Sequence, residues 1–279
     1  MAAQDPPRVV LFDVGGVCTL SPFQAILDYE LSLGIPPGWV NWSISKTAPN
    51  GSWHRLERGE IAPDAAFIRG FNADLHDPEQ WQAFYKAHQA RHPDLPRTPP
   101  ALPDIDGEAL FHAMMQAARS PDPWIWPALQ RLRASGRFVV MALSNTVIFP
   151  RGHALFVDDA VDRKFRSSFD VFVSSAHVGL RKPDPRIYQL ALREANKVVT
   201  EHAGTEGAAE ILPRDVVFLD DIGENLKEAR KQGFRTIKVP LGRAFEAVDE
   251  LEKMTGLKLA GNHPRIRLQS KRADNKAKI

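Results

Sequence analysis

The chain has 279 residues, of which 43% are hydrophobic and 25% are charged, and a formal net charge of +2 at pH 7. This length allows one large domain or two smaller ones with a sizeable buried core, and the composition is ordinary for a globular protein. Residues 263–279 carry a net charge of +5, which leaves −3 on residues 1–262. The body therefore offers no basic face for nucleic acid, and we expect the short basic tail to be solvated.

Cysteine content and the absence of sorting signals predict a cytoplasmic protein. Cys18 is the only cysteine, so no disulfide can form within the chain, and we expect Cys18 to be a small core residue. We identify no secretory signal and no apolar stretch of the roughly 20 residues that span a bilayer. The C-terminal Ala277-Lys278-Ile279 resembles a relaxed Ser-Lys-Leu peroxisomal address, which makes a peroxisomal location the alternative.

The predicted elements begin with a short apolar strand at residues 9–12, of the kind buried on both faces of a parallel sheet. The strand ends at the carboxylate of Asp13, and Gly15 and Gly16 follow. Ligands of open α/β sheets bind at the carboxyl ends of the strands. Asp13 is therefore a candidate nucleophile or metal ligand, and the alternative is an Asp that begins a glycine-rich turn.

The next hundred residues predict helices and no strand. Apolar residues at helical spacing indicate a helix over residues 21–33 that Gly34 ends. Further helices are predicted at residues 52–58, 63–72, 78–89 and 106–118. The Pro-rich stretch 92–103 is expected to be a loop or a semi-rigid connector. We interpret residues 20–120 as a helical cap domain inserted into the first domain.

Strands and helices alternate from Trp126 onward. Strands are predicted at residues 137–143, 170–174, 216–219 and 234–239, and helices at 127–135, 185–196, 224–232 and 245–254. The polar stretch 200–209 is expected to be a mobile insertion. This alternation predicts an α/β fold, with a Rossmann-like parallel sheet core of residues 1–19 and 121–262, the inserted cap and a basic tail at 263–279.

Polar side chains follow the predicted strands. They are Asp13, Ser144, Asn145, Lys182, Asp220 and Asp221. Each has an ordinary explanation by itself, as a turn, a surface loop or a helix N-cap. In a parallel sheet, however, they share one edge, and one cleft would hold three carboxylates, a lysine and a hydroxyl. So many desolvated charges require mutual compensation, which a divalent cation and an anionic substrate supply best.

Four motifs in order carry a resemblance to a known family. Starting at Phe12, Leu143, Gly179 and Phe218, they read Phe-Asp-Val-Gly-Gly-Val, Leu-Ser-Asn, Gly-Leu-Arg-Lys-Pro-Asp-Pro and Phe-Leu-Asp-Asp-Ile-Gly-Glu-Asn. The ordered set resembles the haloacid dehalogenase-like hydrolase superfamily over nearly the whole chain. It most resembles the branch with the N-terminal phosphatase domain of soluble epoxide hydrolases and certain sugar-1-phosphate phosphatases. The resemblance implies Mg²⁺-dependent hydrolysis of a small phosphomonoester through an aspartyl-phosphate intermediate.

The resemblance also implies a role for each residue that handles the phosphoryl group. Asp13 would be the nucleophile that takes the phosphoryl group. Ser144 and the backbone N–H of Asn145 would bind the phosphoryl oxygens. Lys182 would neutralise charge on the nucleophile and on the transferring group.

The implied Mg²⁺ site uses the same edge of the sheet. The carboxylates of Asp13 and Asp221 and the carbonyl of Gly15 would be ligands, and Asp220 would bind the ion or hold its waters. Asn225 is expected either to steady that loop or to be an ordinary polar residue of a first helical turn.

Gly15 departs from the family pattern, which most often has a second Asp at this position to protonate the leaving oxygen and later activate water. Glycine keeps the carbonyl, so we expect Mg²⁺ binding to persist while acid–base help of about 10²–10⁴-fold is missing. The substrate would then have a good leaving group, or a cap histidine (His54 or His76, each otherwise an ordinary surface residue) would supply the proton. The alternative function is a catalytically silent phosphometabolite-binding or regulatory protein. Active relatives of the branch carry this glycine, which favours a working, selective phosphatase.

A dehalogenase function is a further alternative. Dehalogenation needs no metal and would leave Asp220 and Asp221 without a role, so we disfavour it.

The cap tryptophans are expected mostly to form the core of the cap, although amphipathic aromatics can also line a pocket. They are Trp39, Trp42, Trp53 and Trp81. Neither the identity of the substrate nor the oligomeric state follows from the sequence.

Overall fold

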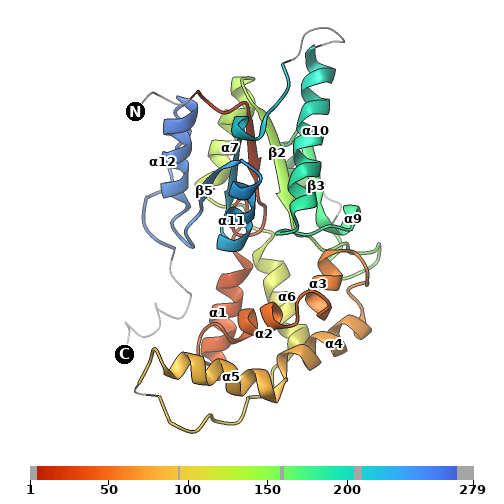
Figure 1. The fold of residues 1–279 in the computed structure, drawn as a ribbon, viewed down its shortest axis with the longest axis vertical. Helices are drawn as coiled ribbons and strands as arrows, with labels where there is room; N and C mark the ends of the chain where they lie inside the picture. Colours follow the sequence, from red (N-terminus) through yellow and green to blue (C-terminus); the bar gives the residue numbers. More distant parts are fainter. Residues whose placement is uncertain (1–4, 94, 158–159, 204–208, 269–279) are drawn as a thin grey trace.

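The computed structural model describes residues 5–93, 95–157, 160–203 and 209–268 (Figure 1). The tripeptide Ala277-Lys278-Ile279 lies outside the described residues, as do residues 204–208 of the predicted insertion at 200–209, whereas residues 200–203 belong to a helix. None of the helices in the described ranges is both long enough and apolar enough to cross a membrane.

A five-stranded parallel sheet forms the centre of the molecule, with the strand order β3-β2-β1-β4-β5. Its strands are β1 (Val9–Phe12), β2 (Val139–Ser144), β3 (Val171–Ser174), β4 (Val216–Asp220) and β5 (Arg235–Lys238). The central strand pairs with two neighbours, so that Val9 lies opposite both Val139 and Val216. This arrangement confirms the predicted Rossmann-like parallel sheet.

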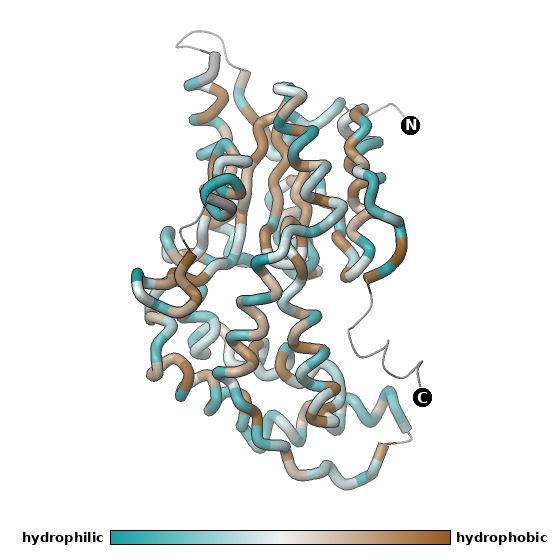
Figure 2. Tube along the Cα trace, turned by 180° about the vertical axis from the view of Figure 1, so that it is seen from behind, coloured by the Kyte–Doolittle hydropathy of each residue, from teal (hydrophilic) through white to brown (hydrophobic). Residues whose placement is uncertain are grey.

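Helices cover both faces of the sheet, and the apolar strands run between them (Figure 2). Val10 and Phe12 face one core cluster, and Val9 and Leu11 face the other, as the alternation of side chains along a strand requires. The first cluster includes buried residues of α7 (Ile125–Ser135) and α12 (Ala244–Thr255), and the second includes those of α10 (Pro185–Ala203) and α11 (Gly223–Lys231). Cys18 is fully buried in the first cluster, which confirms its expected place in the core, and burial raises the pKa of its thiol.

Between β1 and β2 the chain forms a helical region that lies beyond the carboxyl ends of the strands (Figure 1). Its helices are α1 (Pro22–Leu33), α2 (Trp39–Lys46), α3 (Ser52–Glu57), α4 (Ala65–Leu75), α5 (Pro78–Gln89) and α6 (Gly107–Ala117). They surround a core cluster of their own in which Trp39, Trp53 and Trp81 are buried, and Trp39 packs edge-to-face on Trp81. This confirms the core role of these tryptophans. The domain boundaries at residues 19–20 and 120–121 stay a prediction.

Several helices were missed or misplaced by the sequence analysis. Helix α10 continues to Ala203, so its predicted end at residue 196 is wrong. β-Branched residues lower helix propensity there, but Ala191, Ala195 and Val198 form one buried stripe that packs with the sheet residues of its core cluster. The short helices α8 (Ala160–Arg166) and α9 (Ser175–Val178) were not predicted either.

Helix α2 was also missed, and it depends on a residue outside it. Its N-cap, Gly38, has no side chain to accept a hydrogen bond from the first turn. The carboxylate of Glu30, 1% exposed, accepts instead from the N–H groups of Gly38 and Val40, each at 2.8 Å. A capping group eight to ten residues away is invisible to local N-cap patterns.

We expect Glu30→Ala to destabilise the protein by about 1–3 kcal/mol, because two N–H groups of the helical region lose their acceptor. Glu30→Gln keeps one acceptor oxygen and should lose less. Denaturant unfolding measures both, with Glu250→Ala, an exposed position of α12, as a control within about 0.5 kcal/mol of wild type. Equal stabilities for Glu30→Ala and the control would contradict this capping role.

Candidate active site

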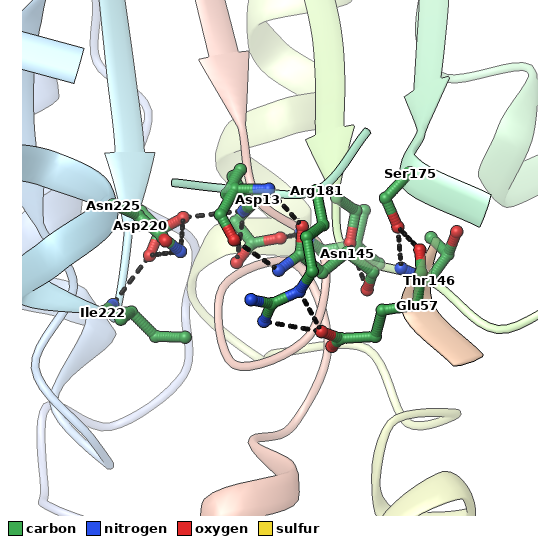
Figure 3. A network of polar contacts seen from close by, with 12 residues as sticks. Asp13, Glu57, Asn145, Thr146, Ser175, Arg181, Asp220, Ile222 and Asn225 are labelled. Atoms are coloured by element: carbon green, nitrogen blue, oxygen red, sulfur yellow. Dashed lines mark hydrogen bonds and ion pairs between the residues drawn. The ribbon is translucent and has the colours of Figure 1, made fainter. Parts of the chain in front are cut away.

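The three central strands deliver polar side chains to one edge of the sheet (Figure 3). Asp13 directly follows β1, Ser144 ends β2, and Asp220 ends β4 with Asp221 next to it. Lys182 reaches the same place from the loop after α9, eight residues beyond the end of β3. Residues more than two hundred positions apart therefore meet in one site.

Lys182 is the centre of this site. Its side chain is completely buried, and its Nζ lies 2.8 Å from Oδ2 of Asp13 and 2.7 Å from Oδ2 of Asp220. Burial alone would lower the pKa of Lys182, but the two carboxylates raise it above its ordinary value. The lysine is therefore a buried, charged ammonium group that bridges two strand ends.

The three carboxylates are crowded. One oxygen from each of Asp13, Asp220 and Asp221 lies within 4.8 Å of the others. Burial raises the pKa of Asp13 to about 7, against the effect of Lys182 and with that of Asp220. Burial also raises the pKa of Asp221 well above its usual range, and repulsion from Asp13 and Asp220 adds to this. One lysine does not balance three carboxylates, so the site favours an additional positive charge.

Asp221 has a carboxylate oxygen that is available to bind such a cation. Its Oδ1 is buried without a hydrogen-bond partner. A Cβ at Gly16, where φ is +83°, would lie 2.2 Å from Oδ2 of Asp221, so only glycine fits beside this carboxylate. A site made only of oxygen ligands suits Mg²⁺, and the residues present fit that ion.

Both carboxylate oxygens of Asp220 already have partners within the protein. In addition to Lys182, it accepts hydrogen bonds from the N–H of Ile222 at 2.7 Å and from Nδ2 of Asn225 at 3.1 Å. Asn225 thus steadies the loop, as one of the two interpretations expected. Because its oxygens are engaged, Asp220 is better placed to hold Lys182 than to be a main ligand of a cation.

Asn145 joins two loops of the site. Its Oδ1 accepts from the N–H of Lys182 at 2.8 Å, and its Nδ2 donates to the carbonyl of the same residue at 3.1 Å. The resemblance implies a role only for the backbone of Asn145, so this side-chain role was not predicted. Ser144 is 3% exposed and donates to the carbonyl of Asn145 at 3.3 Å.

Of the two cap histidines, His54 differs from the expectation of a surface residue, whereas the side chain of His76 is 33% exposed. His54 is 4% exposed, and burial, with the nearby charges of Arg181 and Arg58, lowers its pKa to about 4. A ring that is neutral at pH 7 is a poor proton donor. His76 is held by its own region, with Nδ1 2.8 Å from the carbonyl of Asn72 and Nε2 accepting from Ile105. Neither histidine therefore takes over the role missing at Gly15.

A network at the cap side of the site was missed entirely. Arg181, the neighbour of Lys182, pairs with Glu57 at the end of α3. Ser175, at the start of α9, donates to the carbonyl of Glu57 and accepts from the N–H of Thr146, so it connects these two residues. Arg181 belongs to the motif that starts at Gly179, whereas Glu57, Ser175 and Thr146 lie outside the four motifs. Because Glu57 is 124 positions from Arg181, no local signal could have identified this contact.

No family model matches the chain. It is 28% identical over 261 residues to acyl-CoA dehydrogenase family member 10 of Mus musculus, a match that covers 93% of this chain and 20% of that protein. It is 28% identical over 263 residues to bifunctional epoxide hydrolase 2 of Sus scrofa, covering 90% of this chain and 39% of that one. The chain thus spans between a fifth and two fifths of the length of these relatives.

Among solved structures, the chain is similar to a HAD-family enzyme of Bacteroides thetaiotaomicron in complex with magnesium and inorganic phosphate. The two are 19% identical with a TM-score of 0.44, over 85% of this chain and 96% of that one. A dehalogenase with an intermediate complex is 20% identical with a TM-score of 0.47, over 93% of this chain and all of that chain.

We expect Asp221→Asn to have opposite effects on stability without and with Mg²⁺. Removing one crowded carboxylate relieves repulsion, so the metal-free variant should unfold at a higher temperature than wild type. Wild type should gain about 2.7 kcal/mol at a Mg²⁺ concentration of 100 times Kd, and most of this gain should disappear in the variant. Thermal unfolding with and without Mg²⁺ measures both effects.

Asp104→Asn, which changes a fully exposed carboxylate of the helical region, is the control and should behave as wild type. An equal Mg²⁺-induced shift in wild type and Asp221→Asn would exclude Asp221 as a ligand.

Proposed function

Because the chain belongs to the haloacid dehalogenase-like hydrolase superfamily, we propose that it is a Mg²⁺-dependent phosphatase that hydrolyses a small phosphomonoester. The observation that supports this most is the buried Lys182 between Asp13 and Asp220, with the unpartnered oxygen of Asp221 beside them. The buried ammonium group of Lys182 needs carboxylate partners because water does not reach it. Three carboxylates beside one lysine leave an excess of negative charge, which favours the binding of a cation.

In the proposed reaction, a carboxylate oxygen of Asp13 attacks phosphorus, and the bond from phosphorus to the leaving oxygen breaks. Lys182 favours the ionised form of the nucleophile and offsets charge on the transferring group, while Ser144 and the N–H of Asn145 bind phosphoryl oxygens. Water then attacks the phosphorus of the aspartyl phosphate, which releases inorganic phosphate and restores Asp13. Mg²⁺, held by Asp13, Asp221 and the Gly15 carbonyl, would supply further positive charge for the phosphoryl oxygens.

The substrate is proposed to be a phosphate with a good leaving group, such as an acyl phosphate or a sugar-1-phosphate. Gly15 has no proton to donate, His54 has a lowered pKa, and His76 is engaged elsewhere. An acidic leaving alcohol or acid departs without protonation, so it needs none of these groups.

Gly15 also supports a second candidate function, that of a catalytically silent protein that binds a phosphorylated metabolite or has a regulatory role. Such a protein would keep the groups that bind Mg²⁺ and phosphate and lack turnover. Hydrolysis by the wild-type chain separates the two functions.

We expect wild type to hydrolyse p-nitrophenyl phosphate and a panel of phosphorylated metabolites only with Mg²⁺, and Asp13→Asn to lose at least about 10³-fold in kcat/KM. Asparagine is nearly isosteric but is no nucleophile. The control Asp104→Asn should keep full activity. Mg²⁺-dependent binding of inorganic phosphate by wild type without turnover of any phosphate would instead support the silent protein.

We expect the wild-type rate to rise steeply as the leaving alcohol becomes more acidic across a series of aryl and alkyl phosphates. Gly15→Asp should flatten this dependence and raise rates on poor leaving groups by up to about 10²-fold. A Cβ at Gly15 meets only Pro22, at 3.8 Å, which is ordinary van der Waals contact, so the backbone there accepts a Cβ without a clash. A flat dependence in wild type would mean that another residue donates the proton.

A further inference from the structure

The end of helix α3 contacts the loop that carries Lys182. Nε and Nη2 of Arg181 both lie 2.7 Å from Oε2 of Glu57, the last residue of α3 (Figure 3). The Glu57 side chain is 10% exposed and that of Arg181 is 20% exposed, so water screens this pair only in part. Arg181 points toward the helical region, while the next residue, Lys182, is buried at the sheet edge.

Glu57 is also linked, through Ser175 at the start of α9, to the loop that follows β2. The carbonyl of Glu57 accepts a hydrogen bond from Oγ of Ser175 at 2.5 Å. Oγ of Ser175, a fully buried residue, in turn accepts from the N–H of Thr146 at 2.9 Å. Thr146 directly follows Asn145, whose side chain holds Lys182. One residue of the helical region is thus linked to both loops that would bind the phosphoryl group, directly to Arg181 and through Ser175 to Thr146.

The chain after α3 also lies directly on the core. Gly59 has a φ of +68°, and a Cβ there would be 2.2 Å from the carbonyl oxygen of Ala176 in α9. Such close backbone contact leaves no room for a side chain or a water between the two segments. The helical region is therefore docked on the core at the place where Glu57 makes its contacts.

We propose that Glu57 is a positioning residue for phosphoryl transfer, which holds the Lys182 and Asn145 loops in their reactive places while the cap is docked. This inference rests on the proposed phosphatase function. Glu57 restrains Arg181, and this limits rotation of the adjoining peptide, so that Nζ of Lys182 keeps its bridge between Asp13 and Asp220. Displacements of about 1 Å at such a group can cost 10²-fold in rate. Docking of the cap is thereby linked to the reactivity of the site.

The test uses Glu57→Gln in the full-length protein with Mg²⁺ and p-nitrophenyl phosphate. This variant removes the charge but keeps the backbone carbonyl that binds Ser175. We expect kcat to fall about 10–100-fold while KM changes by less than about threefold, because Glu57 does not touch the substrate. The control is Glu60→Gln, three residues after Glu57. This substitution breaks an ion pair between Glu60 and Arg58 and should keep wild-type kcat.

Two further variants separate positioning from a general loss of stability. Arg181→Met should lose as much kcat as Glu57→Gln, and the double variant should lose no more than either one, since both remove the same contact. Arg181→Lys, which keeps the charge, should recover part of the rate. Additive losses, or a loss of kcat in Glu60→Gln equal to that in Glu57→Gln, would overturn the proposal.

Hydrogen exchange tests the proposal without relying on activity. The amides of Thr146 and Lys182 donate to Ser175 and Asn145, and in Glu57→Gln they should exchange at least about tenfold faster than in wild type. Amides of the central strand should be unchanged. If wild type hydrolyses no phosphate, the proposed function fails, but faster exchange still supports the Glu57 contact. Unchanged exchange at Thr146 and Lys182 overturns the contact even in an active phosphatase.

Discussion

The buried ammonium group of Lys182, held between Asp13 and Asp220, is the constraint on which the rest of the site depends. Burying a charge is strongly unfavourable unless close partners of opposite charge replace water. Both partners sit at the ends of adjacent strands, so the parallel pairing of β1 with β4 sets the distance between them. The sheet thereby determines where the Asp13 carboxylate lies and places beside it the one ammonium group that favours its ionised form.

Charge balance then divides the roles of the two consecutive aspartates. Asp220 is saturated by Lys182, Ile222 and Asn225, whereas Asp221 keeps a buried oxygen without a partner. The metal-free site therefore keeps repulsion that the fold alone does not relieve, as is common where function and stability compete. A divalent cation would relieve this repulsion, and in the proposed function it would do so where the anionic phosphoryl group binds.

Local patterns predicted the elements whose signals lie inside them. The helix predicted over residues 21–33 and ended by Gly34 is α1, for which the structure adds Ser21 as the N-cap and a left-handed conformation at Gly34. The apolar strand before Asp13 lies at the centre of the sheet. Helix α2 was missed because its capping group, Glu30, belongs to another helix. The end of α10 was misplaced because burial of Val198 outweighs weak helix propensity.

By itself, the sequence determined the α/β class, the succession of strands along the chain and the polar residues that follow them, because hydropathic period and turn residues are local properties. Only the tertiary structure decided that Asp221 rather than Asp220 has a free oxygen, that His54 is buried, and that Glu57 contacts Arg181 across 124 positions. These features depend on which distant segments are brought into contact, and no periodicity within a segment records its neighbours in space.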